Sequence, residues 1–334
     1  MKKIRIAFFD TKEYDSSFFT EKNESYGFEL KFYKGHLNIN NVMLSQKADA
    51  VCVFVNDVVD REVIASLSAN KVKLIALRCA GFNNVDLNAA KEYGIKVVRV
   101  PAYSPYAVAE HTVALMMGLN RRIPRATWRT RDGNFSLTGL LGFDMHDKTA
   151  GIIGTGKIAK ILIKILRGFG MKILANDLYP DKQFAKENDV LYTDLDTLYQ
   201  ESDVISMHCP LTPETKYLIN TEAVQKMKPG VMIINTSRGK LINTEALIEG
   251  LKSKRIGYAG LDVYEEEAGY FYEDTSDRII DDDVLARLLS FNNVIVTSHQ
   301  AFFTKEALAN IASTTLQNVK DFFEGAEIIN EVKE

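Results

Sequence analysis

Three side chains suited to acid–base chemistry and anion binding each follow a different predicted strand. Arg238 lies in the sequence N-T-S-R-G, Glu267 ends the sequence L-D-V-Y-E-E-E, and His299 lies in S-H-Q-A-F. A guanidinium can hold a carboxylate through two parallel hydrogen bonds and polarise an adjacent carbonyl group. A histidine exchanges a proton near neutral pH, and a carboxylate behind its ring would orient the ring and favour its cationic form. Together the three residues suit the nicotinamide-linked reduction of a 2-keto acid.

The spacing of these residues leaves alternatives open for each of them. Arg238 could equally be an arginine of a surface turn, and Glu267 belongs to a run of three glutamates that could form a solvated face. His208 also ends a predicted strand and competes with His299 for the role of proton donor. The pattern by itself therefore allows any of the three glutamates and either histidine.

A glycine-rich turn in mid-chain has the sequence of a dinucleotide-binding motif. It joins a strand predicted over 149–153 to a helix predicted over 157–169. In such a turn, Gly154 permits the tight bend, Gly156 lets the backbone approach a pyrophosphate, and the small Ala159 lets the helix pack closely on the strand. The amide groups at the helix N-terminus attract the phosphate charge. The alternative is a tight strand-to-helix turn without a ligand.

Asp177 lies just past the next predicted strand, at 171–175. A carboxylate there accepts hydrogen bonds from both ribose hydroxyls of an adenosine and repels a 2′-phosphate. No arginine follows it, because the next residues are Leu178 and Tyr179. The sequence therefore predicts NAD as the cofactor, in preference to NADP.

Composition excludes several other classes of protein. The 334 residues carry 41 Lys and Arg against 44 Asp and Glu, which gives no electrostatic case for nucleic acid or an acidic membrane as partner. No apolar run approaches the roughly 18 residues of a membrane span. The three cysteines lack C-x-x-C spacing, so we expect no disulfide and no metal site, and a reduced, cytoplasmic protein.

Short strands alternate with helical patterns along the whole chain, which predicts parallel, doubly wound α/β sheets. Five strands are expected before the glycine motif and six from 149 to 297. The final helix, at 305–323, could cap the first sheet and make that domain discontinuous. We therefore expect a domain of 1–101 with 300–334 and an NAD-binding domain of 102–299, with hinges near Pro101 and His299 and a cleft between the domains.

The motifs together resemble those of the D-2-hydroxyacid dehydrogenase family, and most of all its fermentative D-lactate dehydrogenases. The resemblance covers essentially the whole chain. It rests on the glycine motif with Asp177, on H-C-P-L-T at 208–212, and on the N-T-S-R-G, L-D-V-Y-E-E-E and S-H-Q-A-F sequences. It implies a Rossmann cofactor domain and a flavodoxin-like substrate domain in a homodimer or larger homo-oligomer. The apolar helix around 108–119 is then expected in the core or in a subunit interface.

The family resemblance also assigns roles to residues. It implies that Arg238, Glu267 and His299 are the catalytic set, and it places Asp262 near the nicotinamide. The expected substrate contacts are Arg78, Ala80, Gly81, Tyr103, Arg238 and His299. The expected cofactor contacts are Gly154, Gly156, Lys157, Ile158, Asp177, Cys209, Pro210, Thr215, Thr236, Ser237 and Asp262.

The residues after His299 bear on the choice of substrate. Gln300 and Ala301 are followed by Phe302 and Phe303, and these bulky rings indicate a small, closed pocket suited to the methyl group of pyruvate. Reversible, NADH-dependent reduction of pyruvate to D-lactate is therefore the expected activity. One alternative is a dehydrogenase for larger, branched or aromatic 2-keto acids. The other is an NAD-sensing corepressor or binding module, which would not need a complete catalytic set.

Overall fold

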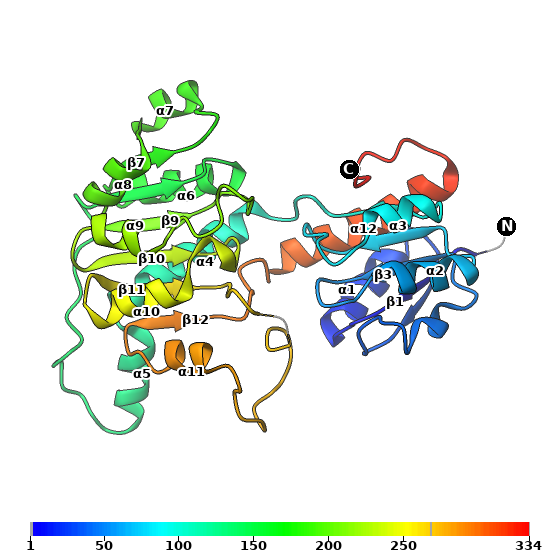
Figure 1. Ribbon diagram of the computed structural model, residues 1–334, viewed down its shortest axis with the longest axis horizontal. Helices are drawn as coiled ribbons and strands as arrows, with labels where there is room; N and C mark the ends of the chain where they lie inside the picture. Colours follow the sequence, from blue (N-terminus) through cyan, green and yellow to red (C-terminus); the bar gives the residue numbers. More distant parts are fainter. Residues whose placement is uncertain (1–2, 268, 334) are drawn as a thin grey trace. The chain divides into compact units, whose positions relative to one another are not determined.

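The computed structural model describes residues 3–267 and 269–333, and the chain divides into two compact units. The first unit comprises Met1–Ser104 and Phe303–Glu334, and the second comprises Pro105–Phe302. The boundaries predicted from the sequence were 101/102 and 299/300. Each unit is built on one parallel sheet with helices beside it (Figure 1). The predicted class of two parallel-sheet α/β domains is confirmed.

The first unit has five strands in the order β2-β1-β3-β4-β5. This is the flavodoxin-like order of a doubly wound sheet. β3 and β4 are buried along their whole length, as expected for strands of a parallel sheet that is covered on both faces. The strands are β1 (Arg5–Phe8), β2 (Glu29–Phe32), β3 (Ala50–Val53), β4 (Leu74–Leu77) and β5 (Lys96–Val98).

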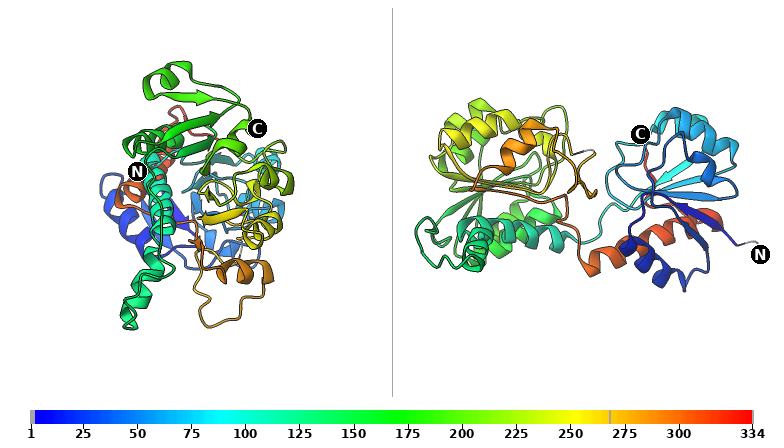
Figure 2. Two further views of the ribbon diagram at one scale, coloured as in Figure 1. Left: turned by 90° about the vertical axis from the view of Figure 1, so that its left-hand side faces the viewer. Right: turned by 90° about the horizontal axis from the view of Figure 1, so that it is seen from below.

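The C-terminal helix α12 (Lys305–Glu324) belongs to this first unit. It packs against β4 and lies beside α1 (Glu13–Asn23), from the opposite end of the chain (Figure 2). The sequence did not predict α1, because only Asp15 and Phe19 of this helix are buried and no apolar stripe marks it. The other helical segments are η1 (Val42–Ser45), which is a 3-10 helix, α2 (Arg61–Ala69) and α3 (Leu87–Glu92).

The second unit has seven parallel strands in the order β12-β11-β10-β9-β6-β7-β8. Chain order reverses between β6 and β9, which is the switch point of a Rossmann-type sheet. One strand more is present than the sequence predicted, the three-residue edge strand β8 (Val190–Tyr192). The others are β6 (Thr149–Ile153), β7 (Lys172–Asn176), β9 (Val204–Met207), β10 (Val231–Asn235), β11 (Ile256–Leu261) and β12 (Val294–Val296).

Helices cover both faces of this second sheet. α4 (Pro105–Asn120) and α6 (Lys157–Gly168) pack together on one face. Successive strand residues point to opposite faces, so Ile152 joins the apolar cluster under these helices and Ile153 the cluster on the other side. The remaining helices are α5 (Ile123–Arg131), α7 (Lys182–Asn188), α8 (Leu195–Glu201), α9 (Thr221–Lys226), η2 (Gly239–Leu241), α10 (Thr244–Lys252) and α11 (Asp283–Leu289).

The apolar segment at the start of the second unit forms two helices, with the break just before Pro124. α4 ends at Asn120, Arg122 adopts a left-handed conformation with φ of 53°, and α5 begins with Pro124 in its first turn. α4 is a core helix, whereas none of the residues of α5 is buried. Within the described part of the chain, no helix is both long and apolar enough to cross a membrane.

Candidate active site

The glycine turn between β6 and α6 leaves room for a phosphate group. Gly154 has a φ of +87°, and a Cβ at this position would lie 2.6 Å from the backbone nitrogen of Cys209. Gly156 directly precedes α6, and a Cβ built on it would meet no atom within 4 Å. Ala159 is fully buried between helix and sheet. The turn therefore has the tight bend, the open approach and the close packing that a pyrophosphate at a helix N-terminus requires.

Asp177 directly follows β7, and it is hydrogen-bonded to the glycine turn. Its Oδ2 accepts hydrogen bonds from the amide of Thr155 at 2.5 Å and from Thr155 Oγ1 at 2.9 Å, and its Oδ1 accepts one from the amide of Tyr179 at 2.8 Å. Partial burial opposes ionisation of this carboxyl, but the hydrogen bonds from Tyr179 and Thr155 outweigh it and lower the pKa of Asp177. The carboxylate is thus charged and held in place. The sequence missed Thr155 and Tyr192, whose hydroxyl groups lie 2.9 Å apart.

Replacing Asp177 by alanine should weaken the preference for NADH over NADPH. The variant loses the acceptor for the ribose hydroxyls and the charge that repels a 2′-phosphate, and each charge-assisted hydrogen bond contributes about 1.5–3 kcal/mol. We expect kcat/KM for NADH to fall by roughly 10–100-fold while the value for NADPH stays level or rises. The matched control is Asp181→Asn, which removes a neighbouring charge and keeps an N-cap residue for α7. An unchanged ratio of the two cofactors in Asp177→Ala would remove Asp177 from the adenosine site.

Most of the other predicted cofactor contacts lie in two loops that are bonded to each other, one after β10 and one after β9. Ser237, after β10, donates a hydrogen bond from Oγ to the carbonyl oxygen of Cys209, after β9, at 2.8 Å. Thr215 holds the second loop through a hydrogen bond from its Oγ1 to the carbonyl oxygen of Pro210 at 2.7 Å. Thr236 is buried, and its hydroxyl oxygen lies 2.9 Å from the hydroxyl oxygen of Thr112 of α4. Lys157 and Ile158 form the first turn of α6, beside the glycines.

Arg238, Asp262 and His299 follow β10, β11 and β12, which are neighbours in the sheet. The turn that carries Arg238 is held by Asn235, whose side-chain Nδ2 donates a hydrogen bond to the carbonyl oxygen of Arg238 at 2.8 Å. Only glycine fits at the next position, because a Cβ on Gly239 would lie 1.9 Å from the carbonyl oxygen of Tyr264. The missing side chain lets the arginine turn pack directly on the chain segment that leads to Glu267.

Each glutamate of the acidic run has a different partner. Oε1 of Glu267 lies 3.1 Å from Nδ1 of His299. Glu265 accepts a hydrogen bond from the backbone amide of Thr244 at 2.8 Å, and Glu266 forms an ion pair with Lys240 at 3.0 Å. The structure therefore brings Glu267, and neither of its neighbours, to the histidine. A carboxylate on Nδ1 orients the ring and so determines the direction of the Nε2 atom.

The rival histidine, His208, lies in a different environment. Its Nε2 atom is 2.8 Å from Oγ of Ser206, and no carboxylate is bonded to it among the described residues. Part of the residue is accessible, but desolvation of the ring lowers the pKa of His208 to about 4. A neutral imidazole is a poor proton donor, so this low pKa and the carboxylate partner of His299 both favour His299.

Asp262 supports the turn at His299. Its carboxylate accepts hydrogen bonds from Thr297 Oγ1 at 2.5 Å and from the amides of Gln300 and Ala301 at 2.9 and 2.8 Å. Burial opposes ionisation, but hydrogen bonds from His111, Thr297 and Ala301 outweigh it and lower the pKa of Asp262. The sequence placed Asp262 among the cofactor contacts. The structure shows both of its carboxylate oxygens bonded to the turn.

His111 of α4 also contacts this turn. It was expected in the core or an interface, and its Nε2 atom lies 3.2 Å from Thr297 Oγ1 and 3.4 Å from Asp262 Oδ1. Its place on α4 gave no sign of this contact, because β11 and β12 are more than one hundred residues away along the chain.

Arg78 of the first unit is buried, not directed to an open surface. Its guanidinium donates to the carbonyl oxygens of Phe9 and Asp10 at 3.0 and 2.5 Å and lies 3.3 Å from a carboxylate oxygen of Asp15. The guanidinium is bonded to the loop after β1 and so stabilises the strand ends. A contact between Arg78 and the substrate carboxylate stays a prediction.

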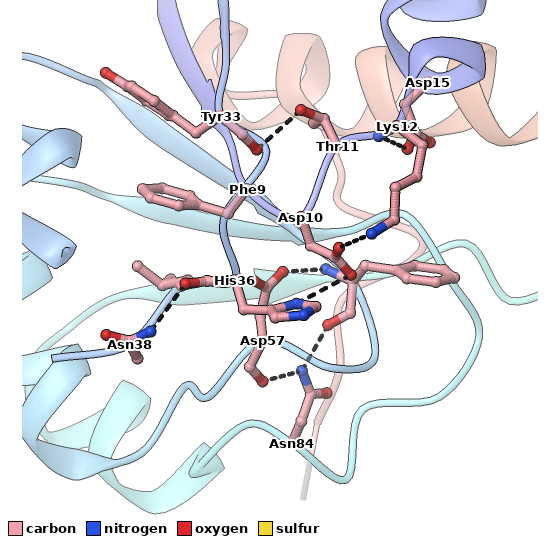
Figure 3. Close-up of polar contacts among 12 residues, drawn as sticks. Phe9, Asp10, Thr11, Lys12, Asp15, Tyr33, His36, Asn38, Asp57 and Asn84 are labelled. Carbon is pink, nitrogen blue, oxygen red and sulfur yellow. Dashed lines mark hydrogen bonds and ion pairs between the residues drawn. The ribbon is translucent and has the colours of Figure 1, made fainter. Parts of the chain in front are cut away.

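Polar groups at the carboxyl ends of the first sheet form one bonded cluster (Figure 3). The carboxylate of Asp10 lies 3.1 Å from Nζ of Lys12 and 3.4 Å from Nδ1 of His36. Asp57 accepts hydrogen bonds from the amides of Leu37 and Phe54, and burial, opposed by Arg78, raises its pKa to about 6. Nδ2 of Asn84 donates to the carbonyl oxygens of Phe54 and Asp57, both at 2.8 Å.

This cluster fixes the loop after β4, which contains two of the predicted substrate contacts. Ala80 and Gly81 are half-buried, and their carbonyl oxygens accept hydrogen bonds from Arg99 at 2.8 Å and from the thiol of Cys79 at 3.3 Å. Tyr103 is also half-buried, and its carbonyl oxygen accepts a hydrogen bond from Asn310 at 2.7 Å.

Comparison with known proteins finds similar sequences and similar folds over nearly the whole chain. The family model of the D-isomer-specific 2-hydroxyacid dehydrogenase NAD-binding domain matches residues 113–301. D-lactate dehydrogenase of Escherichia coli K12 is 55% identical over 329 residues, which are 98% of this chain and 100% of that protein. Pyruvate reductase of Chlamydomonas reinhardtii superposes with a TM-score of 0.94 at 43% identity, covering 98% of both chains. D-lactate dehydrogenase with NAD+ from Lactobacillus jensenii superposes with a TM-score of 0.84 at 32% identity, covering 99% of this chain and all of that one.

Proposed function

Because the chain belongs to the D-isomer-specific 2-hydroxyacid dehydrogenases, which are NAD-dependent oxidoreductases, we propose that it is a D-lactate dehydrogenase. It would catalyse the reversible reduction of pyruvate to D-lactate. The observation that carries the proposal is the 3.1 Å contact between Glu267 and His299 at the end of the sheet that holds the glycine turn and Asp177. The family prediction and the choice of NAD are confirmed.

The proposed roles of the residues follow from their chemistry. Bound NADH supplies a hydride to the carbonyl carbon of pyruvate. Arg238 binds the substrate carboxylate and polarises the carbonyl group. His299, oriented by Glu267, donates a proton to the carbonyl oxygen, so one hydride and one proton convert the ketone to an alcohol. In the reverse direction the neutral imidazole accepts that proton. The backbone of Ala80 and Gly81 and the side chain of Tyr103 are proposed further substrate contacts, as the family resemblance implies.

The activity test compares two substrates and the configuration of the product. We expect NADH absorbance to fall rapidly with pyruvate and slowly with a branched-chain 2-keto acid, and chiral chromatography should show the D isomer of lactate. Faster turnover of the branched acid would favour the alternative of a dehydrogenase for larger substrates. A product that is mainly L-lactate would reject the stereochemical assignment.

A homodimer or larger homo-oligomer is part of the proposal. α4 packs inside the second unit, but the segment that follows it exposes large apolar side chains. Trp128 is 65% exposed and Leu137 is 82% exposed. Ile123, Phe135 and Leu141 of the same stretch are also more than half exposed. Apolar side chains gathered on one segment, unlike single exposed residues, are typical of protein–protein contacts. The mass in solution, measured by light scattering, decides between a monomer and an oligomer.

The cytoplasm is the proposed compartment. Cys52, Cys79 and Cys209 are buried and form no disulfide with one another. Burial raises the pKa of Cys209 to about 11, which keeps its thiol protonated and slow to oxidise. Three such thiols are typical of proteins in reducing compartments.

A further inference from the structure

The backbone at His299 has a conformation that an L residue rarely adopts. Its φ is +53°, in the left-handed region that favours glycine. The amide of His299 donates to the carbonyl oxygen of Asp262 at 2.7 Å, and the next two amides are bonded to the Asp262 carboxylate. These bonds hold the amide side of the turn. Because β12 ends at Val296, the carbonyl oxygen of His299 lies beyond the hydrogen bonds of the sheet and needs a donor from another group.

Tyr272 supplies that partner. Its hydroxyl group donates a hydrogen bond to the carbonyl oxygen of His299 at 3.1 Å. Its ring also stacks on the imidazole, with 5.9 Å between ring centroids and an interplanar angle of 30°. One side chain therefore contacts both the backbone and the ring of the proposed proton donor. Glu267 bonds only the ring, and Asp262 bonds only the backbone.

The segment that carries Tyr272 is attached to the core of the second unit. Phe271 is a buried member of the apolar cluster on one face of the sheet, and the rings of Tyr270 and Tyr272 pack against the same cluster. The amides of Tyr270 and Phe271 donate to the carbonyl oxygen of Glu267 at 3.2 and 3.0 Å. Tyr272 is thus placed by the same short segment that places Glu267, so the two groups approach His299 together.

We propose that Tyr272 is a positioning residue that holds His299 in its left-handed turn and sets the plane of its imidazole. The inference rests on the proposed role of His299. In this arrangement the hydrogen bond from Tyr272 fixes the peptide that follows His299, and the stacked ring limits rotation of the imidazole. A fixed ring keeps Nε2 in the direction needed for proton transfer, and small errors in the placement of a reacting group lower the rate strongly.

The test compares two substitutions of Tyr272. Tyr272→Phe keeps the stacked ring and loses the hydrogen bond to His299, and Tyr272→Leu loses both. We expect the single-turnover rate of NADH oxidation with saturating pyruvate to fall by about three- to tenfold in Tyr272→Phe. In Tyr272→Leu it should fall roughly tenfold further. The dissociation constant of NADH, measured by fluorescence, should stay unchanged in both variants, because the cofactor contacts are elsewhere.

The matched control is Tyr270→Phe. Tyr270 lies two residues earlier, packs on the same cluster, and accepts a hydrogen bond from the amide of Asp282 at 3.1 Å without touching His299. We expect the Tyr270→Phe variant to oxidise NADH at the rate of the wild type. Equal losses in Tyr270→Phe and Tyr272→Phe would show a general loosening of the segment and overturn the inference. A wild-type rate in Tyr272→Phe, while His299→Gln is inactive, would also overturn it. An active His299→Gln variant would instead refute the proposed role of His299.

Discussion

Replacing His299 by glutamine is expected to lower the rate of pyruvate reduction by roughly 10²–10⁴-fold at every pH, the usual contribution of a general acid–base group. Glutamine can still form a hydrogen bond to Glu267 and to the substrate, but it cannot donate a proton to the carbonyl oxygen. Binding of NADH should be preserved, because the glycine turn and Asp177 are unaffected. Steady-state kinetics over a pH series, with a separate measurement of NADH binding, provides the comparison.

His208→Gln is the control for this experiment. His208 also ends a strand of the same sheet, but desolvation lowers its pKa to about 4, so its imidazole is neutral near pH 7 and is a poor proton donor there. We expect this variant to keep an activity close to that of the wild type. If His208→Gln lost activity and His299→Gln kept it, the proton donor would be the other histidine.

Arg238→Lys is expected to cause the second large loss. Lysine preserves the charge but lacks the planar pair of N–H donors that can bind a carboxylate and an adjacent carbonyl oxygen together. Loss of one charge-assisted hydrogen bond corresponds to a decrease of roughly 10–100-fold in kcat/KM for pyruvate. Since this bond serves the carbonyl group as charge develops on it, kcat should fall while KM rises.

Lys240→Gln is the matched control for Arg238→Lys. Lys240 lies two residues further along the chain and forms an exposed ion pair with Glu266. Removing its charge tests whether the general positive field of this turn is sufficient to bind the substrate. We expect little change in kcat/KM. Equal effects of the two substitutions would move the substrate carboxylate away from the Arg238 guanidinium.

The sequence was sufficient to predict the class of fold, the family and the cofactor. These rest on local patterns, since a strand, a glycine turn and a helix follow one another in the chain, and Asp177 ends the next strand. Several short elements escaped prediction, among them α1, α7, α8, α11 and β8. α1 buries too few residues to show an apolar stripe, and β8 has only three residues, of which Val190 alone is buried.

The assignment of partners within the site depended on tertiary structure. The spacing left three adjacent glutamates equivalent, and only the family resemblance singled out Glu267. In the structure each meets a different group, because the path of the chain after β11 directs only Glu267 to the end of β12. Desolvation separates His208 from His299, although both end strands. Only the tertiary structure shows that the Arg78 guanidinium is bonded to the carbonyl oxygens of Phe9 and Asp10, at the strand ends of the first sheet.

The difference between what the sequence predicts and what the tertiary structure decides is clearest for three residues, Asp262, His111 and Tyr272. The L-D-V-Y-E-E-E sequence identified Asp262 as a residue of interest, but its hydrogen bonds to the turn at His299 exist only because β11 and β12 are neighbours in the sheet. His111 and Tyr272 belong to no motif, and α4 and the segment after Glu267 bring them to that turn. A sequence pattern records the strand, turn and helix that neighbouring residues form. Which side chain supports a catalytic group is decided by contacts between residues far apart in the chain, and these arise only when the sheet is assembled.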